Sequence, residues 1–188
     1  INHVTRVSIL LCGAALIRER EHGTIEHLLA MPVTPTEIML GKIAPYVLIG
    51  VMQAALIIGA GVVMFHVPIV GNFFLLSLLT TLFIATNLAM GFTFSTLAEN
   101  QLQAVQMSMM SFLPSLLLSG FLFPYAGMPQ WAQYLGEIFP LTHFVRIARA
   151  VMLKGSTLAD LRFDATALLV LMLIAMAIAV TRFRRTLD

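Results

Sequence analysis

Four long stretches of this sequence contain no Asp, Glu, Lys or Arg, and they restrict the fold more than any other feature. They cover residues 43–65, 73–97, 102–123 and 165–181. An α-helix rises about 1.5 Å per residue, so about 17 to 25 apolar residues cross the roughly 30 Å hydrocarbon core of a bilayer. We therefore predict an all-α membrane protein, a transmembrane helical bundle in which each stretch is one complete span.

The composition agrees with this prediction. Charged residues make up only 11% of the chain and hydrophobic residues 59%, whereas an ordinary soluble domain carries roughly 25% charged residues. Most of the surface must therefore face lipid or other membrane helices. This excludes a soluble globular domain, a disordered chain, a nucleic-acid-binding protein and a secreted disulfide scaffold. Cys12 lies in an apolar run and is interpreted as a small hydrophobic residue.

The N-terminal stretch, residues 1–17, is too short to span a bilayer and is interpreted as a partial span. Residue 1 is Ile and no basic leader precedes the apolar run, so we expect the chain to be the later part of a longer protein. The basic residues that follow this stretch and the last span are Arg18, Arg20, Lys42, Arg182, Arg184 and Arg185. The positive-inside rule places both groups in the cytoplasm, although four further bases fall in the segment that this topology puts outside.

That outer segment, residues 124–164, shows two short helical patterns. The apolar residues Trp131, Tyr134, Leu135, Ile138 and Phe139 recur at helical spacing, and residues 144–153 form a second amphipathic stretch. Prolines separate the two, which predicts an outer re-entrant hairpin. It could serve as a lid over an outer opening or only as an anchor in the headgroup region, and the sequence does not choose between them.

The cytoplasmic segment, residues 18–42, combines dense charge with an apolar stripe. Ile25, Leu28 and Leu29 share one helical face, so we predict a short helix at the membrane surface that ends at Pro32. The segment also contains several Glu residues. A simple loop would satisfy the positive-inside rule without these Glu residues and without a helix that ends at Pro32. A docking surface for a cytoplasmic partner explains them better.

The sequence shows no catalytic, nucleotide-binding or metal-binding motif. It contains neither a P-loop nor a Gly-x-Ser-x-Gly turn, and no acid lies in the middle of a predicted span. His22 and His27 are five residues apart, which does not match the spacing of the zinc motif HExxH. We therefore predict no enzyme activity, metal or cofactor in this chain, and any ATP-driven work must come from a partner.

Several uncharged polar residues lie at the depth of the predicted spans. Such residues usually hold helices together, and this reading outweighs a substrate site for any one of them. Gln53 and Asn87 are the best exceptions, because an unpaired amide in hydrocarbon is costly. The candidates for a translocation path are Gln53, Asn87, Ser111 and Ser115.

Two groups of motifs resemble those of a known family. Residues 18–29 read REREHGTIEHLL and are followed by MPVTP at 31–35 and EIMLGK at 37–42, which resembles the coupling-helix region of ABC-2 type transporter permeases, especially the bacterial multidrug-export branch. Residues 112–121, FLPSLLLSGF, with PLTHF at 140–144, resemble that family's fifth helix and outer re-entrant hairpin.

The resemblance implies six spans with a large extracytoplasmic domain between the first two, so this chain would lack the first span and that domain. It implies a multi-pass protein of the bacterial cytoplasmic (inner) membrane, in contact with lipid. Two permease chains would pair as a homodimer or heterodimer, and each would dock on a cytoplasmic ATPase subunit that carries the ATP and Mg. A periplasmic adaptor is a further possible partner. The implied docking residues are Arg18, Glu19, Arg20, Glu21, His22, Gly23, Thr24, Glu26, His27 and Leu28.

The leading hypothesis is therefore the permease subunit of an ATP-dependent exporter of drugs or other small amphiphiles. One alternative is a membrane anchor for an ATPase complex without transport of its own. Another is a membrane-embedded enzyme that uses Arg146 and Arg149 on a lipid or glycan phosphate.

Overall fold

The computed structural model describes residues 35–66 and 70–185, and all regular structure in those ranges is helical, as predicted. Together they contain five longer helices, one short helix and a single 3₁₀ turn at Tyr125–Gly127. The helices are α3 (Pro35–Phe65), α4 (Phe73–Leu97), α5 (Gln101–Leu118), α6 (Gln130–Gly136), α7 (Pro140–Lys154) and α8 (Leu158–Arg185).

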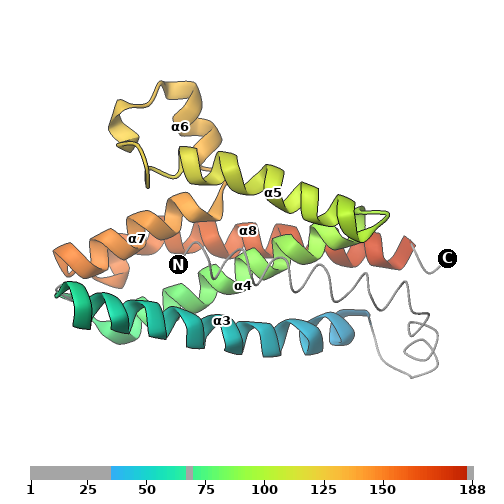
Figure 1. Ribbon diagram of the computed structural model, residues 1–188, viewed down its shortest axis with the longest axis horizontal. Helices are drawn as coiled ribbons and strands as arrows, with labels where there is room; N and C mark the ends of the chain where they lie inside the picture. The colour runs from blue at the N-terminus through green and yellow to red at the C-terminus, as the bar shows by residue number, and fades with distance from the viewer. Residues whose placement is uncertain (1–34, 67–69, 186–188) are drawn as a thin grey trace.

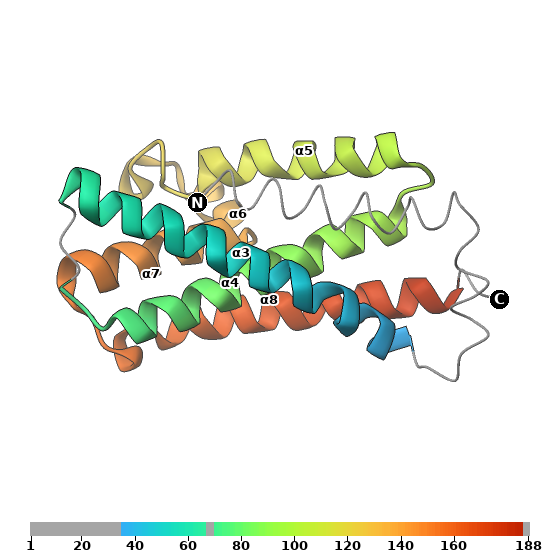
Figure 2. The same ribbon diagram turned by 60° about the horizontal axis from the view of Figure 1, so that its bottom comes forward.

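Helix α4 lies at the centre and contacts α3, α5, α7 and α8. Figures 1 and 2 show α3, α4 and α8 as long helices along one axis, and Figure 1 shows α6 projecting from the bundle. Helices α4 and α8 run parallel, because Thr86 and Thr93 of α4 donate to the carbonyl oxygens of Leu168 and Ala175, each 82 residues ahead. Helix α3 begins and α8 ends at the same end of the bundle (Figure 1).

The main core lies between α4, α7 and α8. Its largest side chains include Phe83 and Phe144, whose rings stack with their centroids 4.2 Å apart. Ile147 and Val151 of α7 and Leu168 of α8 are fully buried beside them. A second core joins α3, α4 and α8 around Leu88. Burying these apolar side chains against one another fixes α7 onto the central pair of helices.

Three described helices are long and apolar enough to cross a membrane: Ala44–Met64, Phe73–Leu97 and Leu158–Thr181. Helix α5 covers most of the third predicted span but is not among them, so four complete spans remain a prediction. The partial span at 1–17 and the coupling segment at 18–34 lie outside the described residues.

Several helix ends differ from the predicted span ends, and two of them have a local structural cause. Helix α5 ends at Leu118, not at residue 123, because Gly120 adopts a left-handed φ of +76° that stops the helix. Helix α8 begins at Leu158, not at residue 165, because Thr157 and Asp160 form a capping pair with the Thr157 N–H and hydroxyl each 2.9 Å from the carboxylate. Apolar content alone marks neither end, since one lies inside an apolar run and the other among charges.

The two helices of the predicted hairpin are present as α6 and α7. Trp131 and Tyr134 of α6 are exposed, at 65% and 74%, as a segment beside a membrane surface would have them. Helix α7 differs from the expected surface helix, because it packs into the bundle and buries residues on several sides. Gly71 allows this close approach, since a Cβ there would lie 2.4 Å from the Val151 carbonyl oxygen.

Candidate functional site

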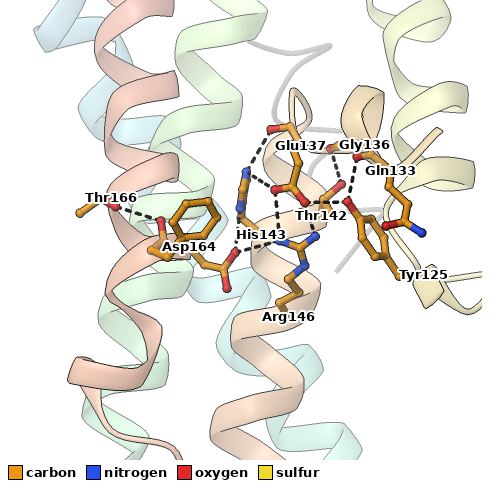
Figure 3. A network of polar contacts seen from close by, with 10 residues as sticks. Tyr125, Gln133, Gly136, Glu137, Thr142, His143, Arg146, Asp164 and Thr166 are labelled. Atoms are coloured by element: carbon orange, nitrogen blue, oxygen red, sulfur yellow. Dashed lines mark hydrogen bonds and ion pairs between the residues drawn. The ribbon is translucent and has the colours of Figure 1, made fainter. Parts of the chain in front are cut away.

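A cluster of polar and charged side chains lies where the α6–α7 corner meets α8 (Figure 3). Its members are Tyr125, Glu137, His143, Arg146 and Asp164. They come from the segment after α5, the α6–α7 corner, α7 and the beginning of α8. In the described residues this is the one network that joins several charged side chains, and it is partly buried, with His143 2% exposed and Glu137 32% exposed.

The local sequence brings these side chains together at the corner. Pro140 occupies the first turn of α7, where its missing N–H costs nothing. The buried Thr142 hydroxyl donates to the Gly136 carbonyl oxygen at 2.6 Å and closes the corner between the two helices. Glu137 follows α6 directly, while His143 and Arg146 are three residues apart on α7 and so share one face.

His143 is buried, with 2% of its side chain exposed, and both ring nitrogens face acceptors. Nδ1 lies 2.8 Å from Asp164 Oδ1, and Nε2 lies 3.0 Å from the Glu137 carbonyl oxygen. Only the imidazolium form can donate from both nitrogens. Burial by itself lowers the pKa of His143, but the hydrogen bonds to Asp164 and to the Glu137 carbonyl outweigh it and raise the pKa overall.

Arg146 pairs with both carboxylates of the cluster. Its guanidinium contacts both oxygens of Glu137, with Nη1 3.1 Å from Oε2, and Nη1 also lies 3.4 Å from Asp164 Oδ1. Burial raises the pKa of Glu137, but the hydrogen bonds from Arg146 and Tyr125 outweigh it and lower the pKa overall. With His143 protonated, two cations balance two anions, so the cluster has no net charge.

Tyr125 completes the cluster on the side of α6. Its hydroxyl donates to Glu137 Oε1 at 2.6 Å and to the Gln133 carbonyl oxygen at 2.8 Å, so these two oxygens share its one proton. The Arg146 guanidinium carbon lies 4.5 Å from the centre of the Tyr125 ring, which is a cation–π contact. The cluster therefore ties the segment after α5, the hairpin corner and α8 to one another.

The four path candidates lie on three helices, α3, α4 and α5, and three of them make hydrogen bonds within their own helix. The Asn87 amide donates to the Phe83 carbonyl oxygen at 2.8 Å, and the hydroxyls of Ser111 and Ser115 donate to carbonyl oxygens of α5 at 3.1 and 2.7 Å. Gln53 of α3 differs, because its Oε1 is buried without a hydrogen-bond partner in the described part of the chain. The ATPase-docking candidates, Arg18 to Leu28, lie outside the described residues.

Sequence patterns do not predict this cluster. Glu137 and Asp164 fall within the predicted outer segment 124–164, and His143 stands only within the family-like stretch PLTHF at 140–144. The Thr157-x-x-Asp160 pair was the available signal, because it places a helix start before Asp164. Of the two arginines in the enzyme alternative, Arg146 is paired with two carboxylates, whereas Arg149 has no carboxylate partner in the described residues.

No group of His, Cys, Asp and Glu in the described ranges could hold a metal ion. Three apolar helices of spanning length, packed with a buried polar corner, define a polytopic helical membrane protein.

The chain belongs to the ABC-2 type transporter family, whose model matches residues 3–153. It is 39% identical to the inner membrane transport permease YhhJ of Escherichia coli over 195 residues, which cover the whole chain and 50% of that relative. It is 34% identical to the probable multidrug ABC transporter permease YbhS of E. coli, over 81% of the chain and 41% of the relative. ABC transporter G family member 20 of Dictyostelium discoideum is 27% identical over 79% of the chain. The chain spans about half the length of the bacterial relatives that it matches.

Proposed function

We propose that this chain is the membrane-embedded part of an ABC exporter permease in the bacterial inner membrane. Its likeness to YhhJ along the whole chain is the observation that carries the proposal. The chain has no nucleotide-binding motif, so a separate cytoplasmic ATPase subunit would bind ATP and Mg and supply the drive. A second permease chain would complete the path, and small amphiphiles are the proposed substrates.

The docking segment is the proposed point of contact with the ATPase. In the proposed topology it precedes α3 on the cytoplasmic side, and α3 begins at the same end of the bundle as α8 ends. A push on that segment would pass directly into α3. The contacts of α3 with α4 and α8 would carry it further, because packed helices move as units.

The polar cluster is the proposed outer latch of the permease. It joins the hairpin corner to α8 through charge-assisted hydrogen bonds, which are stronger than neutral ones and depend on geometry. A tilt of α8 relative to α7 would break several of these contacts together. Such a latch would hold the outer end closed until the ATPase subunits close.

Gln53 is the best-supported of the four proposed path residues. A buried amide oxygen without a partner costs about 1–3 kcal/mol, so it is retained most easily where a ligand or a second chain bonds it. Asn87, Ser111 and Ser115 remain path candidates with their hydrogen bonds already made.

The test is transport by the protein expressed from its own gene and reconstituted in vesicles with its ATPase subunit. Charge reversal by Glu19→Lys together with Glu26→Lys should abolish ATP-dependent movement of the amphiphilic cation ethidium and reduce co-purification of the ATPase. The matched control is Glu99→Lys, which reverses an exposed acid between α4 and α5. Full activity of the double variant would overturn docking at this segment. ATPase binding without transport of any tested amphiphile would favour the anchor alternative.

A further inference from the structure

A cavity of about 290 Å³ lies between α3, α7 and the turn that follows α5. Ile57 of α3 and Phe121 of the turn border it, and Phe144, 2% exposed, lies deepest among these lining residues. Arg149 on α7 contributes a charged side chain to the lining, and the other lining side chains are apolar. This lining suits an occupant that is mostly hydrocarbon and carries an anionic group.

Arg149 differs from its neighbour Arg146 in its partners. Arg146 is neutralised by Glu137 and Asp164, whereas in the described residues no carboxylate pairs with Arg149. One Arg149 nitrogen, Nη2, donates to the Gly120 carbonyl oxygen at 3.0 Å and so holds the guanidinium at the edge of the cavity. A guanidinium has five N–H donors, so most of them remain for an anionic oxygen.

The position of the cavity indicates where such an occupant would come from. Ile57 belongs to the apolar segment Ala44–Met64, which is long enough to span a membrane, so this side of the cavity would lie at the depth of the acyl chains. Arg149 is an exposed residue that can extend its charge toward the headgroup region while its stem lies on apolar surface. A volume near the small end of the range for ligand pockets suits one stretch of acyl chain.

We propose that this cavity is a binding site for an anionic phospholipid, with an acyl chain beside Phe121 and Phe144 and the headgroup phosphate on Arg149. The site is separate from the proposed latch, because Leu141, Phe144 and Ala148 present a different face of α7 from His143 and Arg146. The proposal rests on the membrane location of the chain and not on export, so it survives if the transport proposal fails.

The test uses the full-length protein in nanodiscs of phosphatidylcholine that contain a photoreactive lipid with a diazirine on its acyl chain. Photoreactive phosphatidylglycerol should label the peptides that contain Phe121 and Phe144 about fivefold more than photoreactive phosphatidylcholine does. Arg149→Gln should remove this preference, and Arg149→Lys should keep part of it because the charge remains. The matched control is Arg162→Gln, which removes an exposed cation of α8 outside the cavity.

A second variant separates the cavity from the charge. Ala148→Phe fills the cavity and should reduce labelling by both lipids, while thermal unfolding midpoints show whether each variant is folded. Equal labelling by the two lipids, or an unchanged preference in Arg149→Gln, would overturn the proposal. It also fails if a photoreactive amino acid at residue 121 couples to residues 1–34 or to a second copy, because the cavity is then a protein interface.

Discussion

The imidazole of His143 on α7 lies 2.8 Å from the carboxylate of Asp164 on α8, with the ring buried and its second nitrogen facing the Glu137 carbonyl oxygen. Both nitrogens face acceptors, so the ring makes both hydrogen bonds, one to α8 and one to the α6–α7 corner, only when it is protonated. Glu137 Oε2 lies 3.6 Å from Nε2, and the carboxylates of Glu137 and Asp164 balance the charges of His143 and Arg146. The stability of this corner therefore depends on pH in a direction that can be worked out.

We expect the thermal unfolding midpoint in detergent to be highest between about pH 4.5 and 6.5. The folded pKa of His143 lies above 6.5, so its contribution is complete below pH 6.5 and is lost as the pH rises through the folded value. The folded pKa of Glu137 lies below 4.5, so its contribution is present above pH 4.5 and is lost as the pH falls through the folded value. A His143→Gln variant should lose the decline on the alkaline side. An unchanged profile in that variant would show that His143 is not the titrating group.

Removing the Glu137 charge should weaken the latch. Glu137→Gln leaves Asp164, at the longer distance of 3.4 Å, as the carboxylate that still pairs with Arg146, and we expect a loss of about 1–2 kcal/mol in the free energy of unfolding because the pair is partly buried. Arg146→Gln should cost a similar amount. The double variant should then cost less than the two single losses together, since the interaction is lost only once. Strict additivity in this cycle would mean that the two side chains do not interact.

The hydroxyl bridges between α4 and α8 should be measurable one at a time. Thr93 donates to the Ala175 carbonyl oxygen at 2.9 Å and to the carbonyl oxygen of Ala89 in its own helix. Thr93→Val keeps the shape and removes the bridge, so we expect a loss of about 0.6 kcal/mol, which is the average for such bonds in membranes. Thr81→Val is the control, because the Thr81 hydroxyl bonds the Ser77 carbonyl oxygen of its own helix. Equal losses in both variants would argue against the bridge.

Gly71 should resist substitution, while Gly59 should not. A Cβ at Gly71 would lie 2.4 Å from the Val151 carbonyl oxygen, so Gly71→Ala must push the beginning of α4 away from α7, at a cost of about 1–3 kcal/mol. Gly59 lies inside α3 with nothing within 4 Å of the same position, and Gly59→Ala should be neutral or slightly stabilising. Denaturant titration of both variants in mixed micelles provides the comparison. A tolerated Gly71→Ala would mean that α7 is not packed this closely.

Much of the fold could be predicted from short-range features. Charge-free stretches mark α3, α4 and α8, and amphipathic spacing marks α6 and α7, because the patterns that produce these helices lie within them. The end of α5 and the beginning of α8 could not be predicted from apolar content. The end of α5 depends on the left-handed conformation of Gly120, and the beginning of α8 depends on a capping pair that lies among charged residues.

The sequence by itself determined that the chain lies in a membrane, is helical and carries the family's motifs, because hydrophobicity and motif spacing are properties of adjacent residues. Only the tertiary structure decided that α7 is buried and that His143, Arg146, Glu137 and Asp164 form one neutral cluster. In the sequence these charges resemble a solvated loop. Their pairing depends on the packing of α7 against α8, because a buried charge is stable only when distant parts of the chain bring its counter-charge within bonding distance.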